Sequence, residues 1–445
     1  MNHKLSKYVY FIDCGNCIVM YNLRSRDFLS LNTDLGKLLE SARDNIDMLR
    51  EKHPDLSRLM EEKGFIVDAE TDETKQLVDE WEQEDSDTRK FSIIINPTLG
   101  CNLRCWYCYE NHEHKPLMNE SVYNSILRLI DNKLQSKKLE SLNISFFGGE
   151  PLLGFDKIVM PILTYACQKC KDEGKSITTH FTTNGVLLTK DVLDAINKLE
   201  LSSKAMFQIT LDGNREIHNQ SRVGINKAPT YDTILTNIIR AAESQNMVCA
   251  RLNYKAENLM SFLDVLDDFA DLPDETKRYI RFNLQQIWQD CNCNTVDISN
   301  LVENVKNNFR KEKFFIDSND GNCRHCCYAD MENSVVVNYD GNVYKCTARE
   351  FLPENREGIL HEDGTIEMNG LYARRMAVKY SNPSCLECKI LPICNGACSQ
   401  HKLEACSQTM CYYNISEEEK DRRIVNNLKE LVAMSESNKK IISHI

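Results

Sequence analysis

Three closely spaced cysteines are the first residues in the chain whose type and spacing suggest chemistry. Cys101, Cys105 and Cys108 form a C-x3-C-x2-C group. Three thiolates can hold one metal centre, and a structural zinc ion would need a fourth ligand, which His112 or His114 would supply. An iron–sulfur cubane on three thiolates would instead keep one iron open to a substrate or cofactor. The spacing alone leaves both interpretations open.

A second, larger group of cysteines lies in the carboxyl-terminal third. Twelve of the twenty cysteines fall between Cys291 and Cys411, and such density in a reducing compartment points to metal or redox chemistry. Residues 334–346 predict a hairpin that would present Cys346 at the end of its second strand. Residues 385–398 contain too few apolar side chains for a core of their own, so we expect metal binding to organise them.

The elements that position the first cysteine group begin at residue 91. Short apolar strands alternate there with helical segments, which predicts βαβ units and a parallel sheet of about six strands. Ligands of such sheets lie at the carboxyl ends of the strands, so the loops after the strands should form the site. The expected strands are 91–96, 143–149, 177–185, 206–213, 248–254 and 279–287, and the expected helices are 119–135, 155–172, 190–199, 231–246 and 261–270.

Further motifs lie at the ends of these strands. Gly148, Gly149 and Glu150 follow the second strand, where two glycines would let a ligand approach the backbone and a carboxylate would face an ammonium group. Asn184 lies at the end of the third strand, and Thr210 lies near the end of the fourth. We expect all of these residues to line one site together with the cysteines.

Composition excludes several classes of protein. The length of 445 residues suggests two or three domains, and 42% hydrophobic with 27% charged residues is typical of a globular chain. A net charge of −12 disfavours nucleic acid as a partner. No stretch approaches ~18 uninterrupted apolar residues, and the amino terminus lacks the apolar run of a signal peptide. We therefore expect a cytoplasmic protein with no nucleic-acid or membrane partner.

The cysteine group and the strand-end motifs together resemble the radical S-adenosylmethionine (SAM) superfamily, whose hallmark is C-x3-C-x-aromatic-C in the first strand loop of a partial (β/α)6 barrel. The resemblance implies that a [4Fe-4S] cluster cleaves SAM and that the 5′-deoxyadenosyl radical takes a hydrogen atom from the substrate. Asp212, His218 and Arg222 are interpreted either as a turn with solvated charges or as contacts to substrate or cofactor. The implied site comprises the cluster ligands Cys101, Cys105 and Cys108, Tyr107 beside the adenine, Gly148, Gly149 and Glu150 at the methionyl amine, and Asn184 and Thr210 along the cofactor.

The spacing of the carboxyl-terminal cysteines resembles the SPASM domain, an extension of radical SAM enzymes that act on peptides. The resemblance implies two auxiliary [4Fe-4S] clusters, and two structural zinc sites are the alternative. Cys326 competes with Cys323 for one ligand place, and Cys406 competes with Cys411 for another. The implied ligands are Cys323, Cys327, Cys346 and Cys398 for the first auxiliary cluster and Cys385, Cys388, Cys394 and Cys411 for the second.

The amino-terminal region reads as a small separate domain. Apolar stretches at 8–12, 17–21 and 27–31 predict a three-stranded antiparallel sheet, and two or three short helices follow before the strand-like segment 64–68. The pattern resembles the PqqD-like winged-helix domain, whose exposed sheet edge binds an extended peptide. A docking or dimerisation domain is the alternative. Residues 70–90 are acidic and predict a linker helix.

The expected fold class is therefore α/β, a partial (β/α)6 TIM-like barrel with an amino-terminal winged-helix-like domain and a cysteine-rich SPASM domain at the carboxyl terminus. The final segment is expected to be an amphipathic helix that packs on the barrel. The expected boundaries are 1–90 for the amino-terminal domain and linker, 91–310 for the radical SAM core, 311–415 for the SPASM domain and 416–445 for the final helix.

This combination resembles the maturases of ribosomally made peptides. Cysteine thioether formation is the reaction that we favour, because an auxiliary cluster can bind a thiolate and accept an electron; a carbon–carbon crosslink is an alternative. Anaerobic sulfatase-maturating enzymes share core and tail, but in them an aspartate follows the cysteine that matches Cys346, and here Thr347 takes that place. A non-catalytic zinc or electron-transfer protein would have no use for the motifs at 148–150, 183–185 and 211–213. The implied partners are a precursor peptide, bound by the amino-terminal domain, and a one-electron donor such as flavodoxin or ferredoxin.

Overall fold

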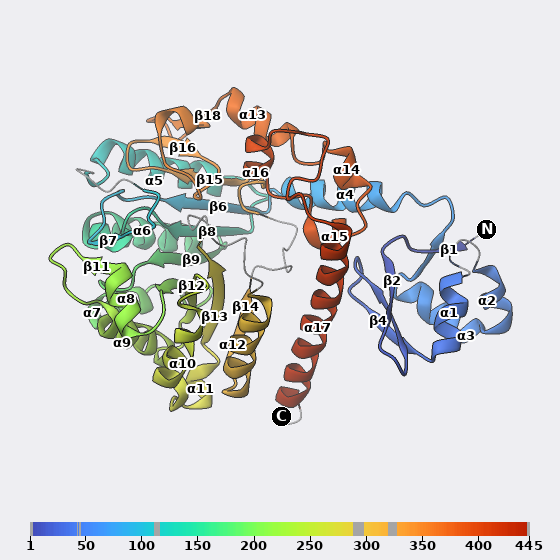
Figure 1. The fold of residues 1–445 in the computed structure, drawn as a ribbon. Helices are drawn as coiled ribbons and strands as arrows, with labels where there is room; N and C mark the ends of the chain where they lie inside the picture. Colours follow the sequence, from blue (N-terminus) through green and yellow to red (C-terminus); the bar gives the residue numbers. More distant parts are fainter. Residues whose placement is uncertain are drawn as a thin grey trace. The chain divides into compact units, whose positions relative to one another are not determined.

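The computed structural model describes residues 3–41, 43, 46–110, 116–287, 298–318 and 327–442 (Figure 1). The chain divides into two compact units, each made of segments that are distant in sequence. The first unit combines residues 1–85, 320–330 and 375–445, and the second combines residues 86–319 and 331–374. Each unit has a hydrophobic core of its own.

The second unit is built on one sheet of eleven strands. Seven neighbouring strands run parallel and alternate with helices along the chain, which confirms the predicted partial (β/α)6 barrel; six of them are the expected strands, and β14 is an addition. These strands are β6 (Lys90–Ile95), β8 (Ser141–Phe146), β9 (Ser176–Thr183), β10 (Met206–Leu211), β12 (Met247–Tyr254), β13 (Ile280–Gln286) and β14 (Phe315–Ser318).

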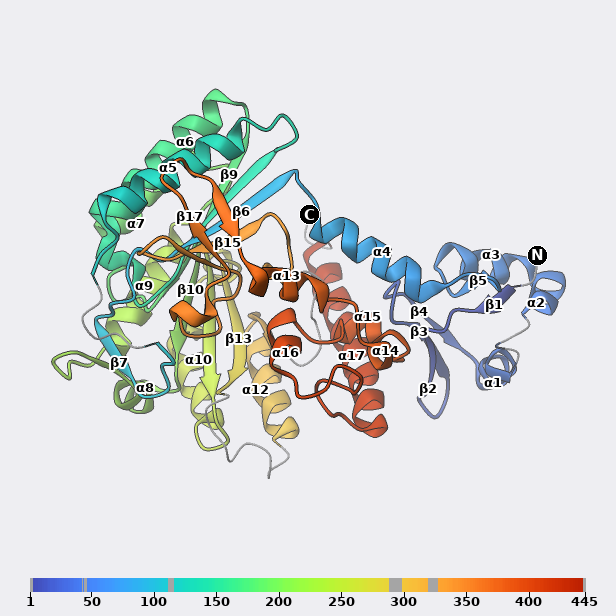
Figure 2. The ribbon, with the colours of Figure 1, turned by 90° about the horizontal axis from the view of Figure 1, so that it is seen from above.

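Strand alternation separates the two faces of this sheet. Along β8, Leu142, Ile144 and Phe146 are buried in the main core, whereas the polar residues between them are half-buried. The helices pack on the apolar face (Figure 2), so the polar face is turned to the inside of the barrel. The helices are α5 (Glu120–Leu134), α6 (Met160–Asp172), α7 (Lys190–Asn197), α8 (Arg215–Ser221), α9 (Tyr231–Glu243), α10 (Phe262–Ala270), α11 (Asp274–Lys277) and α12 (Ser299–Lys311).

Four more strands extend the sheet beyond β6. β15 (Ser334–Val337) runs parallel to β6 and forms an antiparallel hairpin with β16 (Asn342–Tyr344), as predicted. Gly341 has a φ of +83°, the left-handed conformation that the tight turn requires. Two further antiparallel strands, β17 (Gly358–Leu360) and β18 (Ile366–Met368), precede α13 (Gly370–Ala377).

The amino-terminal part of the first unit is a small mixed domain, which we call the head (residues 3–68). Its antiparallel sheet of β2 (Val9–Asp13), β3 (Ile18–Asn22) and β4 (Phe28–Leu31) confirms the predicted three strands. A short ladder joins β1 (His3–Leu5) to β5 (Ile66–Asp68), and α4 (Glu73–Asp85) is the predicted linker helix. The helices of the head are α1 (Thr33–Ser41), α2 (Asp47–Lys52) and α3 (Pro54–Glu62).

The two faces of the head sheet enter two different cores. Met20 faces the core formed with α1, α2 and α3, whereas Tyr21 faces a core shared with α4 and with the carboxyl-terminal helix α17 (Glu417–Ile442). Ile424 and Leu428 of α17 are buried in that second core, and the Tyr21 hydroxyl donates to Asn427 Oδ1 at 2.5 Å. The apolar stripe of α17 therefore packs in a core of the first unit, with the head, α4 and residues 390–393, and the prediction that assigned this stripe to the barrel core was wrong.

Candidate active site and metal centres

The first cysteine group lies in the loop that follows β6, as predicted. Cys105 ends the short strand β7 (Leu103–Cys105), which pairs with β11 (Arg222–Gly224) so that Arg222 lies opposite Cys105. Cys101 and Cys105 are partly buried and Cys108 is exposed. Burial raises the pKa of the Cys105 thiol, and the Arg222 charge opposes that rise. The pairing therefore supplies a cation to a group of three potential thiolate ligands.

Arg222 is a buried cation with unused hydrogen-bonding capacity. Its side chain is 7% exposed, and Nη1 donates to the Tyr107 hydroxyl at 2.7 Å. Its Nε has no hydrogen-bond partner among the described residues. Buried polar atoms are rarely left unpaired without reason, so the guanidinium is suited to an anionic group of a ligand that lies beside the cysteines.

Tyr107 and Asp212 complete a polar cluster with this arginine. The Tyr107 hydroxyl donates to Asp212 Oδ1 at 3.1 Å and accepts from Asn253 Nδ2 at 3.2 Å. Asp212 is 1% exposed, and within the described part of the chain its Oδ2 has no partner. Burial raises the pKa of Asp212, and the Arg222 charge opposes that rise. Of the two interpretations of these loop residues, the solvated turn is wrong, because Asp212 and Arg222 are both buried.

His218 organises the backbone of the same loop. Its Nδ1 accepts from the Asp212 amide at 3.4 Å, and its Nε2 lies 3.2 Å from Thr230 Oγ1, which donates to the Arg222 carbonyl at 2.7 Å. Burial, then the Arg222 charge, lowers the pKa of His218 well below its usual value. A neutral imidazole therefore holds the two loop segments that carry Asp212 and Arg222.

The two glycines after β8 allow the cysteine loop to pack closely against the backbone there. A Cβ on Gly149 would lie 2.2 Å from the Gly100 carbonyl oxygen, and one on Gly148, whose φ is +107°, would lie 2.4 Å from that of Thr98. The Glu150 amide donates to the Gly100 carbonyl at 2.8 Å. The glycines therefore allow the chain's own loop to approach, and the close approach of a ligand to their backbone stays a prediction.

Glu150 joins the ends of β8 and β9. Its Oε1 accepts from the Leu152 amide and from Thr183 Oγ1, at 3.0 and 2.8 Å, and its Oε2 accepts from the Asn184 amide at 2.7 Å. The residue is 0% exposed. That its carboxylate also contacts an ammonium group of the cofactor remains a prediction.

Asn184 follows the end of β9, and Thr210 lies near the end of β10. Asn184 Nδ2 donates to Asn102 Oδ1 at 2.7 Å and lies 3.7 Å from Cys101 Sγ. Thr210 is half-buried on β10, in register with Arg251 of β12. Glu150 after β8 and Asn184 after β9 thus meet the cysteine loop, and no described contact joins Thr210 to it.

Glu110 is a buried residue of this region that the sequence reasoning missed. Its exposed fraction is 9%, and among the described residues neither carboxyl oxygen has a hydrogen-bond partner. Burial, then the nearby Glu350, raises the pKa of Glu110 to about 8. The only feature of the sequence that could have indicated a role for Glu110 is its position two residues after Cys108.

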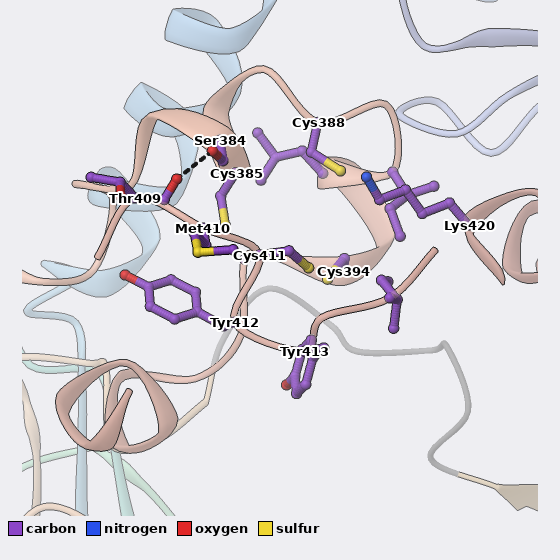
Figure 3. A pocket seen from close by; sticks show the side chains of 14 residues that line it. Ser384, Cys385, Cys388, Cys394, Thr409, Met410, Cys411, Tyr412, Tyr413 and Lys420 are labelled. Carbon is purple, nitrogen blue, oxygen red and sulfur yellow. Dashed lines mark hydrogen bonds between the residues drawn. The ribbon is translucent and has the colours of Figure 1, made fainter. Parts of the chain in front are cut away.

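Four of the carboxyl-terminal cysteines line one cavity of about 330 Å³ in the first unit (Figure 3). Two short helices, α14 (Pro383–Leu386) and α15 (Leu391–Cys394), hold part of the wall. Ser384 Oγ donates to the Thr409 carbonyl at 2.6 Å and so ties the opposite wall to α14. The four cysteines are Cys385, Cys388, Cys394 and Cys411, the set that the sequence assigned to the second auxiliary cluster, and Cys406 is not among the lining residues.

The set assigned to the first auxiliary cluster is divided. Cys327 and Cys398 belong to the first unit, and Cys346 follows β16 in the second. Cys323 lies outside the described residues, as do the alternative ligands Cys326, His112 and His114. Within the described ranges, no three His, Cys, Asp or Glu side chains are grouped so as to hold a single metal ion.

Residues 95–269 match the model of the radical SAM superfamily. A cysteine-type anaerobic sulfatase-maturating enzyme of Clostridium novyi is 23% identical over 348 residues, 71% of this chain and 89% of that protein. A serine-type enzyme of Klebsiella aerogenes is 22% identical over 365 residues, 73% of this chain and 84% of the relative. The solved structure of native anSMEcpe with bound AdoMet and Kp18Cys peptide has a TM-score of 0.59 at 18% identity, covering 78% of this chain and 99% of its own.

A membrane-crossing helix is not found in the part of the chain that the structure describes. The segment that matches the superfamily model contains the cysteine loop, the glycines, Glu150, Asn184 and the buried cluster around Arg222. Residues 95–269 accordingly form a domain that matches the radical SAM superfamily in sequence and carries the motifs of its cysteine loop and strand ends.

Proposed function

We propose that this enzyme modifies a ribosomally made peptide and forms a cysteine thioether in it. The observation that carries the proposal is the cavity lined by Cys385, Cys388, Cys394 and Cys411, which supports a second iron–sulfur site in addition to the radical SAM cluster. When bound, the cofactors supply a 5′-deoxyadenosyl radical that takes a hydrogen atom from the peptide, and an auxiliary cluster that takes the electron released when a thiolate bonds to the resulting carbon radical.

The residues around the cysteine loop fit SAM, which carries a carboxylate, an ammonium group and a ribose. Arg222 offers its unpaired N–H to the carboxylate, and Asp212 and Asn253 lie in the same polar cluster. The buried polar atoms that lack partners in the chain would thereby gain them in the complex. The proposed ligands and contacts are Cys101, Cys105 and Cys108 for the cluster, and Tyr107, Gly148, Gly149, Glu150, Asn184, Thr210 and Arg222 for SAM.

The head is proposed to bind the precursor peptide in the manner of a PqqD-like domain. One face of its sheet packs against α1, α2 and α3. On the other face, β2 and β3 pack against α4 and α17. Because both faces are covered, an extended peptide can pair only with an edge strand. The β2 edge is partly occupied, because Arg43 Nη2 donates to the Val9 carbonyl at 2.7 Å. No described strand pairs with the outer edge of β4. The β4 edge is therefore the proposed peptide site.

Formylglycine formation is the second candidate, because the relatives from Clostridium novyi and Klebsiella aerogenes are named as sulfatase-maturating enzymes. Thr347 counts against it, since a carboxylate is expected at that place in those enzymes. The Tyr109 hydroxyl donates to the Thr347 carbonyl. Glu110, which follows Tyr109 in the sequence, is buried. Formylglycine formation at a cysteine removes the sulfur and so gives a product of different mass, whereas oxidation of a serine removes two hydrogen atoms, as a thioether does, but leaves the cysteine thiol reactive.

The test uses anaerobically reconstituted protein with SAM, a one-electron donor such as flavodoxin or ferredoxin, and a panel of short cysteine-bearing peptides. A thioether removes two hydrogen atoms from the peptide and consumes the thiol, so iodoacetamide no longer adds to the product. A carbon–carbon crosslink leaves the thiol reactive, and formylglycine formation at a cysteine removes the sulfur; either product would overturn the thioether proposal. Cys105→Ala is expected to form no 5′-deoxyadenosine.

A further inference from the structure

The cysteine-lined cavity has a buried lysine beside it. Lys402 lies on α16 (Ser399–Glu404) and is 4% exposed. Its Nζ donates to the Lys379 carbonyl and lies 5.7 Å from the centre of the Tyr380 ring. Among the described residues, no carboxylate lies within ion-pair distance of it. An ammonium group in such a place is costly unless a negative group compensates it.

The ammonium group lies next to a proposed cluster ligand. Gly396 has a φ of +63°, and a Cβ on it would lie 3.4 Å from Cys385 Sγ and 3.9 Å from Lys402 Nζ. The sulfur and the ammonium group therefore border the same small space beside Gly396. Burial lowers the pKa of Lys402, and Asp330 and then Cys385 oppose this effect. The negative charge of a thiolate-held cluster would add to the compensation that Asp330 provides.

A second lysine borders the cavity but is differently placed. Lys420 lines the cavity wall, yet its Nζ lies 2.5 Å from Glu417 Oε1, and Glu417 is exposed to solvent. Its charge is therefore neutralised within the chain and screened by water. Lys402 forms no ion pair among the described residues and is almost fully buried. The electrostatic field of its charge at the cluster is therefore expected to be stronger than that of Lys420.

We propose that Lys402 is a positioning residue that raises the reduction potential of the cluster held by Cys385, Cys388, Cys394 and Cys411. The role rests on the proposed cluster and goes beyond it by assigning its electrostatic tuning to one side chain. A fixed positive charge stabilises the reduced, more negative cluster relative to the oxidised one. Lys402 thereby makes this cluster a better acceptor for the electron that bond formation releases.

The test is a redox titration of the full chain in which Cys101, Cys105 and Cys108 are alanine, so that only auxiliary clusters contribute to the spectrum. Lys402→Met is expected to shift one midpoint potential to a more negative value, with unchanged iron content. Lys402→Arg is expected to keep the parent potential. Lys420→Met removes a charge from the same cavity and serves as the matched control, with a smaller shift expected.

An unchanged midpoint potential in Lys402→Met, at full iron content, would overturn the role of Lys402 and leave the cluster assignment intact. If Lys402→Met loses the cluster, Lys402→Gln, which keeps an N–H donor for the Lys379 carbonyl, is titrated instead, and a parent-like potential there overturns the proposal. A parent protein without an iron–sulfur signal would refute the proposed auxiliary site itself.

Discussion

At the scale of single residues, unpaired buried atoms identify the site more sharply than residue types do. The sequence could not decide whether Asp212, His218 and Arg222 lie in a solvated turn, because burial of a charged loop depends on distant segments. In the structure all three are buried, and Asp212 Oδ2 and Arg222 Nε have no partner in the described chain. The cysteines, in contrast, could be singled out as candidate ligands from their spacing, since a metal centre requires several ligands close together, but that spacing left zinc and iron–sulfur ligation both open.

His218 predicts a pH dependence of stability. Its folded pKa is depressed by burial and by the Arg222 charge, so below the usual histidine pKa the unfolded chain binds a proton that the folded chain does not. Stability is therefore expected to fall as the pH drops below ~6.5, by up to ~1.4 kcal/mol per pH unit from this residue. Unfolding midpoints measured from pH 7.5 to pH 5 should fall more steeply for the wild type than for His218→Gln.

His361 provides the control for that experiment. Its side chain is 45% exposed and lies 3.1 Å from Glu367, away from any buried network. His361→Gln is expected to follow the wild-type profile. Parallel profiles for the wild type and His218→Gln would contradict the assignment of the pH effect to His218.

At the scale of elements, the alternation of apolar strands and helices predicted the parallel sheet, because hydrophobic periodicity is a local property of the chain. The pairing of β7 with β11 escaped prediction, since three-residue strands carry too little periodicity to detect. That pairing is what brings Arg222 to Cys105. The packing of the cysteine loop against Gly149 also escaped prediction, because only the fold shows which segment approaches this glycine.

Gly149→Ala is expected to disturb the cysteine loop specifically. The new Cβ would lie within 2.4 Å of the carbonyl oxygens of Leu99 and Gly100, so the loop must shift, at a cost of about 1–3 kcal/mol. Iron analysis after reconstitution should reveal loss of the SAM-binding cluster with the auxiliary iron retained. Gly370→Ala, which meets no atom within 4 Å, is the control. Full iron content in Gly149→Ala would refute the close approach.

Ser30→Pro tests the β4 edge as the peptide site. The Asn22 amide donates to the Asp27 carbonyl at 3.0 Å, and the antiparallel register pairs Ser30 with Val19, so the Ser30 amide points away from β3. Proline removes this outward donor and leaves the ladder to β3 intact. Loss of one hydrogen bond predicts about tenfold weaker binding of a labelled precursor peptide. Ser30→Ala should bind normally, and equal affinities for both variants would exclude this edge.

At the scale of the whole molecule, the order of segments along the chain does not match the order of units. The sequence predicted the head, the barrel and the cysteine-rich region in succession, whereas the head shares a unit with residues 320–330 and 375–445, and residues 331–374 belong to the unit of the barrel. Tyr8 and Tyr21 of the head share a core with Ile390 and Leu391 beside the cysteine-lined cavity. Such contacts join residues from opposite ends of the chain, so no local sequence pattern could predict them. The head is therefore expected to support the tail structurally as well as to bind a peptide.

Trp81 tests this structural coupling. It is 6% exposed on α4, its ring lies 5.7 Å from that of Tyr380, and Cys385 and Cys388 pack against the core that contains it. Trp81→Ala should lower the free energy of unfolding by about 3–5 kcal/mol. Because Cys385 and Cys388 pack against this core, the substitution should also lower the auxiliary iron content, measured in the variant with alanine at Cys101, Cys105 and Cys108. Phe65→Ala removes a buried ring from the other core of the head, so it should weaken folding without loss of auxiliary iron. Full auxiliary iron in Trp81→Ala would mean that the tail binds its metal independently of α4 and of the core that contains Trp81.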